Sequence, residues 1–337
     1  FIHMPTGMGV VMTGTKYNWG FSTQDEPELA NRQLFWPRGK VLGGSSSING
    51  MVYIRGHAAD YDGWRQLGNA GWGYEDVLPY FKLSQNQERG IDEFNGVGGP
   101  LNVKDNGSPL PIHEMFIQAG IEAGYIRNKD FNGASQDGFG PFQLTKIGGK
   151  RCSAATAFLK PIASRQNLTI LTRASLRRVL FEDKRAVGIE YQYKRQIVTA
   201  RSSREIVISA GAVQSPQLLM LSGIGDPYEL MVHGIDCIAP LPGVGKNLQD
   251  HLDIIVQYHC LDESLTLNRF SKLRNMAAAF VQYLLFENGP AIESPLEAGA
   301  FVRSRDDVEV PDLQLHFMPL FLHDHGRKKV AGAGLCM

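Results

Sequence analysis

The sequence has no excess of charge of either sign. Lys plus Arg and Asp plus Glu number 34 each among 337 residues. A protein that binds nucleic acid or an anionic surface through electrostatics carries a basic excess, and none exists here. We therefore expect no nucleic-acid partner. The length allows two domains.

Cysteine is scarce and scattered. The four cysteines, Cys152, Cys237, Cys260 and Cys336, form no CxxC pair and have no spacing typical of metal ligands. This usage predicts reduced thiols, as in a cytosolic protein, and no metal site.

Long apolar runs are missing, and the first residues do not resemble a signal peptide. The longest apolar stretch, MAAAFVQYLLF at 276–286, is too short for a transmembrane segment and contains Gln282. We expect no transmembrane segment. The stretch is predicted as a core helix, with a membrane-surface contact as the alternative.

Small residues are concentrated between positions 36 and 64, where the sequence reads WPRGKVLGGSSSINGMVYIRGHAADYDGW. Gly43 and Gly44 can adopt φ values closed to other residues, and they let a ligand approach the backbone. The serines that follow offer amide and hydroxyl donors. The pattern predicts a turn that either contacts a ligand or is structural.

A second segment, GAVQSPQLLMLSGIG at 211–225, follows the apolar run EIVISA at 205–210. The run predicts a buried strand, and Ser215-Pro216 predicts a helix start, because serine caps helices and proline is tolerated in the first turn. A strand, a small-residue turn and a helix form a common dinucleotide site.

Both segments resemble the signatures of the glucose–methanol–choline (GMC) family of flavin oxidoreductases. The first matches from Gly39-Lys40 to Asp62, and the second matches at every fixed position. The resemblance covers nearly the whole chain. It implies an α/β fold with mixed α+β character: an FAD-binding dinucleotide fold with a β-meander, plus a substrate domain on an antiparallel sheet.

The predicted domains follow this pattern: an FAD-binding domain at 1–65 and 151–250, a cofactor-covering excursion at 66–150, and a substrate domain at 251–330. Helices are predicted near 75–83 and 113–123. Apolar–polar alternation predicts the meander strands and the later strands. These strands are 168–172, 176–182, 187–193, 197–201, 206–209, 254–258, 300–302 and 313–317.

The resemblance also predicts a fragment truncated at both ends. The family's N-terminal strand, G-x-G-x-x-G turn and helix find no match, since Met12 stands at the third glycine position after Gly7 and Gly9. The family's catalytic histidine is expected beyond residue 337. No catalytic residue is therefore assigned within this chain, and the chain alone is expected to be inactive.

The resemblance implies that FAD is the cofactor. The implied cofactor-binding residues are Gly43, Gly44, Ser45, Ser46, Asn49, Gly50, Leu176, Ala210 and Gly211. Some family members attach the flavin through a histidine at the position of Ile48. Isoleucine has no nucleophile, so FAD is expected to be held non-covalently.

Four residues are implied as substrate contacts: Asp253, Leu296, His316 and Leu320. Two alternatives stay open, a core histidine for His316 and a surface carboxylate for Asp253. Gly50 is expected to leave the flavin face open. The aliphatic walls favour uncharged primary alcohols slightly over choline, because an aromatic wall would suit a quaternary cation.

The implied function is FAD-dependent oxidation of a primary alcohol, aliphatic or choline, to the aldehyde, with electrons passed to a quinone or another respiratory acceptor. The alternatives are a non-redox FAD-binding lyase of the same family and an inert fragment. The expected location is the cytoplasm or the inner-membrane periphery. The sequence leaves choline versus alkanol, the acceptor and the oligomeric state open.

Overall fold

The computed structural model describes residues 1–105, 110–270, 272–328, 330 and 332–337. It forms two compact units, one of Phe1–Arg165 with Ile255–Met337 and one of Gln166–Ile254. The predicted domain limits stay a prediction.

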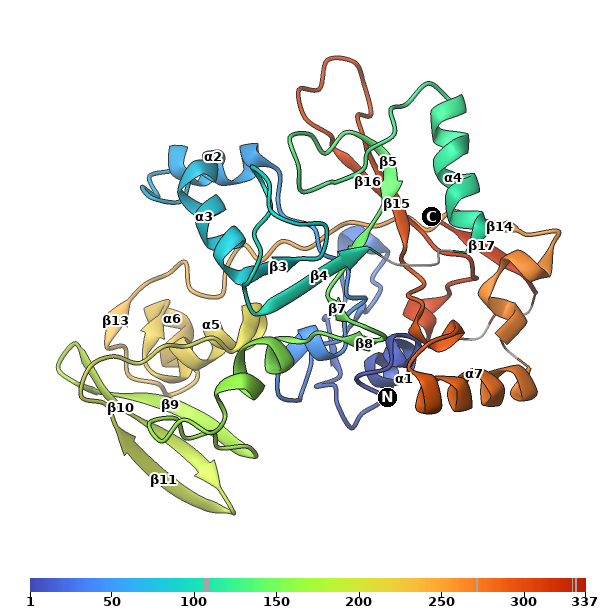
Figure 1. Cartoon of the computed structure of the whole chain (residues 1–337). Helices are drawn as coiled ribbons and strands as arrows, with labels where there is room; N and C mark the ends of the chain where they lie inside the picture. The colour runs from blue at the N-terminus through green and yellow to red at the C-terminus, as the bar shows by residue number, and fades with distance from the viewer. Residues whose placement is uncertain (106–109, 271, 329, 331) are drawn as a thin grey trace. The chain divides into compact units, whose positions relative to one another are not determined.

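Helices and short sheets alternate in the first unit (Figure 1). Its α-helices are α1 Met8–Thr13, α2 Ala58–Gln66, α3 Tyr74–Ser84, α4 Pro111–Glu122 and α7 Leu273–Phe286. Its two-stranded sheets pair β1 Phe21–Ser22 with β2 Phe35–Trp36, β7 Lys146–Ile147 with β8 Lys150–Arg151, and β14 Gln257–His259 with β17 Gly334–Cys336. One three-stranded sheet contains β3 Gln85–Gln87, β4 Leu101–Asp105 and β6 Gln143–Leu144. The other contains β5 Gly138–Pro141, β15 Ala298–Val302 and β16 Leu313–Phe317.

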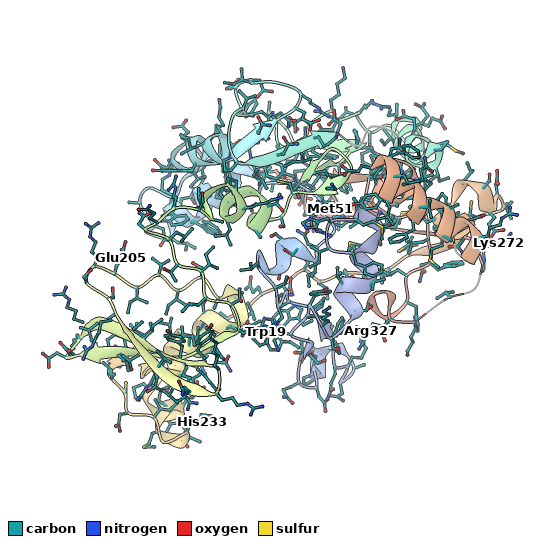
Figure 2. The ribbon with its side chains drawn as sticks, turned by 60° about the horizontal axis from the view of Figure 1, so that its bottom comes forward. Trp19, Met51, Glu205, His233, Lys272 and Arg327 are labelled. Atoms are coloured by element: carbon teal, nitrogen blue, oxygen red, sulfur yellow. The ribbon has the colours of Figure 1, made fainter. Side chains whose placement is uncertain are left out.

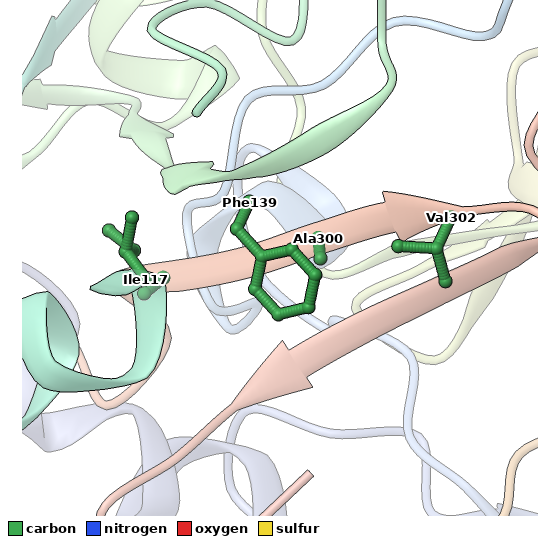
Figure 3. Close-up of a cluster of buried hydrophobic side chains, with 5 residues drawn as sticks. Ile117, Phe139, Ala300 and Val302 are labelled. Carbon is green, nitrogen blue, oxygen red and sulfur yellow. The ribbon is translucent and has the colours of Figure 1, made fainter. Parts of the chain in front are cut away.

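The sheet of β5, β15 and β16 is antiparallel throughout, with Gly299 opposite both His316 and Gly140. Its apolar residues pack against α4 to form a core of Ile117, Phe139, Ala298, Ala300 and Val302 (Figure 3). A Cβ at Gly120 of α4 would lie 2.3 Å from the Phe139 ring, so only glycine at this position leaves room for the ring. The predicted antiparallel sheet is confirmed, with β5 as an additional strand.

The second unit contains the meander, in which β9 Ala174–Glu182, β10 Arg185–Tyr193 and β11 Gln196–Arg201 lie side by side (Figure 1). Their short reversals and alternating pattern made them predictable. The unit also holds α5 Gly211–Leu221, α6 Pro227–Val232 and the parallel pair β12 Ile224–Gly225 with β13 Ala239–Pro240.

Two predicted strands, 168–172 and 206–209, are wrong. Both segments are irregular, including the stretch that follows Glu205 (Figure 2). A strand requires a hydrogen-bonding neighbour, and no described strand pairs with either segment. The predicted strand 254–258 is confirmed only as β14, displaced toward residue 259.

The predicted start of the second signature's helix at Ser215-Pro216 is also wrong. Helix α5 begins at Gly211 and contains Pro216. Ser215 does not cap it from outside, because its Oγ accepts the N–H of Ala210 at 3.0 Å.

The predicted core helix at 276–286 forms as α7, but it is not a core helix in this structure. Tyr283 is buried, whereas Leu284, Leu285 and Phe286 are each more than 60% exposed. Its described neighbours, such as Phe1 stacked on Phe280, cover only part of its surface.

Candidate functional site

The glycine turn, residues 43–49, has two left-handed glycines with different surroundings. Gly43 has φ +87° and Gly44 has φ +55°, a region that favours glycine. A Cβ on Gly43 would lie 2.7 Å from Oγ of Ser47 and 3.0 Å from the amide nitrogen of Ala155. A Cβ on Gly44 would have no described atom within 4 Å. Close packing inside the protein therefore requires glycine at position 43. At position 44 the space beside the backbone is open, so another molecule can approach it there.

Two serine hydroxyls fasten the turn from within. Ser46 donates to the carbonyl of Gly43 at 2.6 Å and accepts the N–H of Ala154 at 2.9 Å. Ser47 donates to the carbonyl of Leu42 at 2.8 Å. The expectation that the serine hydroxyls are donors to a ligand is therefore wrong for these two, since both protons are used inside the protein.

Ser45 differs because it is exposed, and its Oγ accepts the N–H of Gly39 at 3.1 Å. A Cβ at Gly39 would lie 2.1 Å from the carbonyl oxygen of Gly44, so only glycine allows this approach. In this hydrogen bond the hydroxyl of Ser45 is the acceptor, so its own O–H group is not used there. Ser45 remains a predicted cofactor contact.

Arg151, on β8, is buried beneath the turn with 1% of its surface exposed. Its Nε donates to the carbonyl of Ile2 at 3.0 Å, and its Nη1 donates to the carbonyl of Ser46 at 3.1 Å and to Oδ1 of Asn49 at 2.7 Å. Burial lowers the pKa of its guanidinium to about 10. Nη2 is buried and has no hydrogen-bond partner among the described residues.

Asn49 connects this arginine to the surface of the turn. Its Oδ1 accepts a second hydrogen bond, 3.1 Å, from the N–H of Met51. Met51 has no exposed surface and a left-handed φ of +66°, and Figure 2 labels it. Asn49 itself is exposed. Its oxygen therefore faces the protein while the residue lies at the surface.

Gly50 and Leu296, predicted separately as a cofactor and a substrate residue, are in contact. A Cβ at Gly50 would lie 2.6 Å from Cδ1 of Leu296. Ser294 also donates from Oγ to the carbonyl of Gly50 at 3.3 Å. The leucine fills the space that the missing side chain provides, and the expectation that Gly50 leaves the flavin face open stays a prediction.

His316 lies on β16, and Leu320 follows that strand. The imidazole of His316 is half-buried, with its ring centre 5.4 Å from that of Phe142. Because Ala298 pairs with Phe317, the segments that carry Leu296 and Leu320 extend beyond the same end of the two strands. Their contact with a substrate stays a prediction.

The remaining predicted residues belong to the second unit. Leu176 is half-buried on β9, opposite Tyr191. Ala210 precedes α5, and Gly211 begins it with φ +87° and no described atom within 4 Å of an added Cβ. Asp253 is exposed. No described side chain caps α5, so its first N–H groups can receive a negatively charged group.

A buried polar pair, His113 on α4 and Glu297, was not predicted from the sequence. Nδ1 of His113 lies 3.4 Å from Oε2 of Glu297, and both side chains are at most 2% exposed. Burial lowers the pKa of His113 to about 4. Burial also lowers the pKa of Lys146 to about 8, although Glu297 opposes this shift. Lys146 donates from Nζ to the carbonyl of Ile292 at 2.6 Å.

A cavity of about 510 Å³ lies beside Lys146 and is also lined by Lys104, Glu287, Pro290 and Glu293. The predicted cofactor and substrate residues are not among its described lining residues. The sequence did not single out Arg151 either, and only its burial distinguishes it from a surface arginine.

Over residues 6–253 the sequence matches the GMC oxidoreductase family. The chain belongs to this family. It is 45% identical over 333 residues to an oxygen-dependent choline dehydrogenase of Brucella ovis, covering 99% of this chain and 60% of that protein. It is also 45% identical over 336 residues to an alcohol dehydrogenase [acceptor] of Pseudomonas putida, covering 99% of this chain and 61% of that protein. The chain thus spans about 60% of the length of these curated relatives.

Solved structures share the fold. A pyridoxine 4-oxidase from Mesorbium loti superposes with a TM-score of 0.81 at 28% identity, covering 99% of this chain and 62% of that chain. A formate oxidase superposes with a TM-score of 0.90 at 24% identity, covering 99% of this chain and 64% of that chain. The predicted family and fold class are confirmed. Among the helices of the described residues, each is too short or too polar to span a bilayer.

Proposed function

We propose that the protein oxidises a primary alcohol to the aldehyde with FAD held by the glycine turn. The observation that carries this proposal is the open backbone at Gly44 beside the exposed Asn49, in a chain of the GMC oxidoreductase family. FAD supplies the acceptor for the hydride that the alcohol loses. The residues of this chain bind and orient the reactants.

The donors present fit such a cofactor. In the first unit, Gly44 admits a ligand to the backbone, and Arg151 keeps one buried N–H group without an acceptor among the described residues. In the second unit, the uncapped start of α5 at Ala210 and Gly211 suits a phosphate. Leu176 is proposed to contact the adenine through its backbone.

We propose non-covalent attachment, because Ile48 is 3% exposed and offers no nucleophile at the position that carries a linking histidine in some relatives. Acid precipitation of the protein expressed from its complete gene should leave the yellow flavin in the supernatant. Flavin that stays with the precipitate would show a covalent bond. A preparation without flavin, both as purified and after incubation with FAD, would contradict the cofactor proposal itself.

We propose uncharged primary alcohols as substrates in preference to choline. Leu296 and Leu320 are aliphatic, and an aromatic wall would attract a quaternary cation more strongly. The relatives' names include both choline and alcohol dehydrogenases. The kcat/KM for medium-chain alkanols should exceed that for choline, and a much higher value for choline would overturn the preference.

We propose a quinone or another respiratory carrier as the electron acceptor. The name of the Pseudomonas putida relative specifies an acceptor, whereas the Brucella ovis relative is named oxygen-dependent. Turnover with a soluble quinone under anaerobic conditions should exceed oxygen consumption with the same alcohol. Equal or faster turnover with oxygen alone would refute this assignment.

A further inference from the structure

The side-chain amide of Asn49 has a defined orientation. Its Oδ1 receives hydrogen bonds from Nη1 of Arg151 and from the N–H of Met51. Both groups are donors, and a guanidinium has no acceptor atom. Rotating the amide by 180° would place its NH₂ against two donors and break both hydrogen bonds. The hydrogen-bonding chemistry of its two neighbours therefore keeps the amide oxygen inward.

Arg151 cannot move away easily, because separate segments hold it. Its guanidinium donates to the carbonyls of Ile2 and Ser46 as well as to Asn49, and its backbone N–H donates to the carbonyl of His3. No carboxylate pairs with it among the described residues. A buried cation has already lost its hydration, so an acceptor that withdraws leaves a charged N–H group without a partner, and each acceptor is therefore strongly retained.

We propose that Arg151 is a positioning residue that fixes Asn49 with its oxygen inward, so that Asn49 offers only N–H donors to the cofactor. The proposal rests on the proposed function of the glycine turn and deepens it. It specifies that the FAD atom facing Asn49 is a hydrogen-bond acceptor, either a ring carbonyl or nitrogen, or a phosphate oxygen. The amide oxygen is already occupied, and the exposed end of the residue carries only donors.

Asn49→Asp tests the inward and outward ends of the side chain independently. A carboxylate keeps the inward acceptor but has no outward N–H donor. The charge also pairs with Arg151. In the protein expressed from its complete gene, we expect the thermal midpoint of the apoprotein to be unchanged or higher. We expect the Kd for FAD, measured by quenching of flavin fluorescence, to rise about tenfold or more. Gln66→Glu, on exposed α2, adds the same charge and should leave this Kd unchanged.

The role of Arg151 is tested by a double-mutant cycle. Asn49→Ala should raise the Kd for FAD in the wild-type background and raise it much less in Arg151→Lys, because lysine does not hold the amide in the same way. A coupling of at least threefold in Kd supports the proposal. Additive effects would make Arg151 a structural residue only and overturn it.

Two further results for Asn49→Asp would overturn the proposal. One is an FAD Kd within threefold of wild type, and the other is loss of folded apoprotein, because the carboxylate retains both inward hydrogen bonds. If the wild-type protein bound no FAD, the proposed function would fail first, so the two failures are distinguishable. Weaker binding of FAD alone supports a ring acceptor, and weaker binding of both FAD and ADP supports a phosphate acceptor.

Discussion

At the scale of single residues, Gly43 and Gly44 are adjacent but should respond differently to the same substitution. Gly43→Ala adds left-handed strain and a close contact with Ala155, which together destabilise by about 2–4 kcal/mol. Gly44→Ala adds only the strain, about 1 kcal/mol. It should, however, raise the Kd for FAD more than Gly43→Ala does. Urea unfolding and flavin titration measure the two effects, and equal losses for both variants would contradict the assignment.

The contact between Gly50 and Leu296 predicts a rescue. Gly50→Ala places a methyl group 2.6 Å from the leucine Cδ1 and should destabilise by about 1–3 kcal/mol through overpacking. Gly50→Ala combined with Leu296→Ala should recover part of this loss. Additive losses in the urea unfolding free energies of the single and double variants would show that the two side chains do not compete for the space.

At the scale of elements, Ser222 joins the end of α5 to β9. Its buried Oγ accepts the N–H of Val179 at 2.8 Å and donates to the carbonyl of Leu218 at 2.5 Å. Ser222→Ala leaves the Val179 N–H buried without a partner, which costs about 1–3 kcal/mol. Hydrogen exchange at the Val179 amide should accelerate. Ser175→Ala, exposed on the same strand, is the control and should change the stability by less than about 0.5 kcal/mol.

The contact of α4 with the segment before β15 predicts an acid-sensitive stability. Burial lowers the pKa of His113 from 6.5 to about 4, so between these pH values the unfolded chain binds a proton that the folded chain does not. Stability therefore falls as the pH drops from 6.5 to 4, by up to about 3 kcal/mol from this group.

His113→Gln should make the urea midpoint less dependent on pH in this window, whatever its effect at pH 7. The imidazole of His113 contacts the carboxylate of Glu297 and the ring of Phe317. Acid loss of stability that persists in the variant is assigned to groups other than His113. An identical pH profile for both proteins would show that His113 binds its proton equally well in the folded and the unfolded state.

At the scale of the whole molecule, the chain passes between its two compact units at 165–166 and 254–255. Arg165 and Arg173 are exposed and lie outside strands and helices. Limited trypsin digestion should therefore cut first at one of these sites, whereas Arg177 and Arg178 within β9 are protected by their ladder. Mass spectrometry of the earliest fragments identifies the cuts, and initial cleavage inside β9 would contradict the division.

The sequence by itself determined the features that depend on near neighbours along the chain. The meander strands β9, β10 and β11, the helices α3 and α4, and the left-handed Gly43-Gly44 turn follow from alternation, amphipathic spacing and glycine. The two signatures also fixed the family, because each is long and specific.

Only the tertiary structure decided what depends on partners distant in sequence. The segment 206–209 has the composition of a strand but no described ladder partner, so it is not one. Arg151 is 102 residues from Asn49, and Leu296 is 246 residues from Gly50, yet each pair is in contact. Propensity and spacing act over a few residues, whereas burial and hydrogen-bond partners are set by chain packing, and these determine which end of the Asn49 side chain faces the protein.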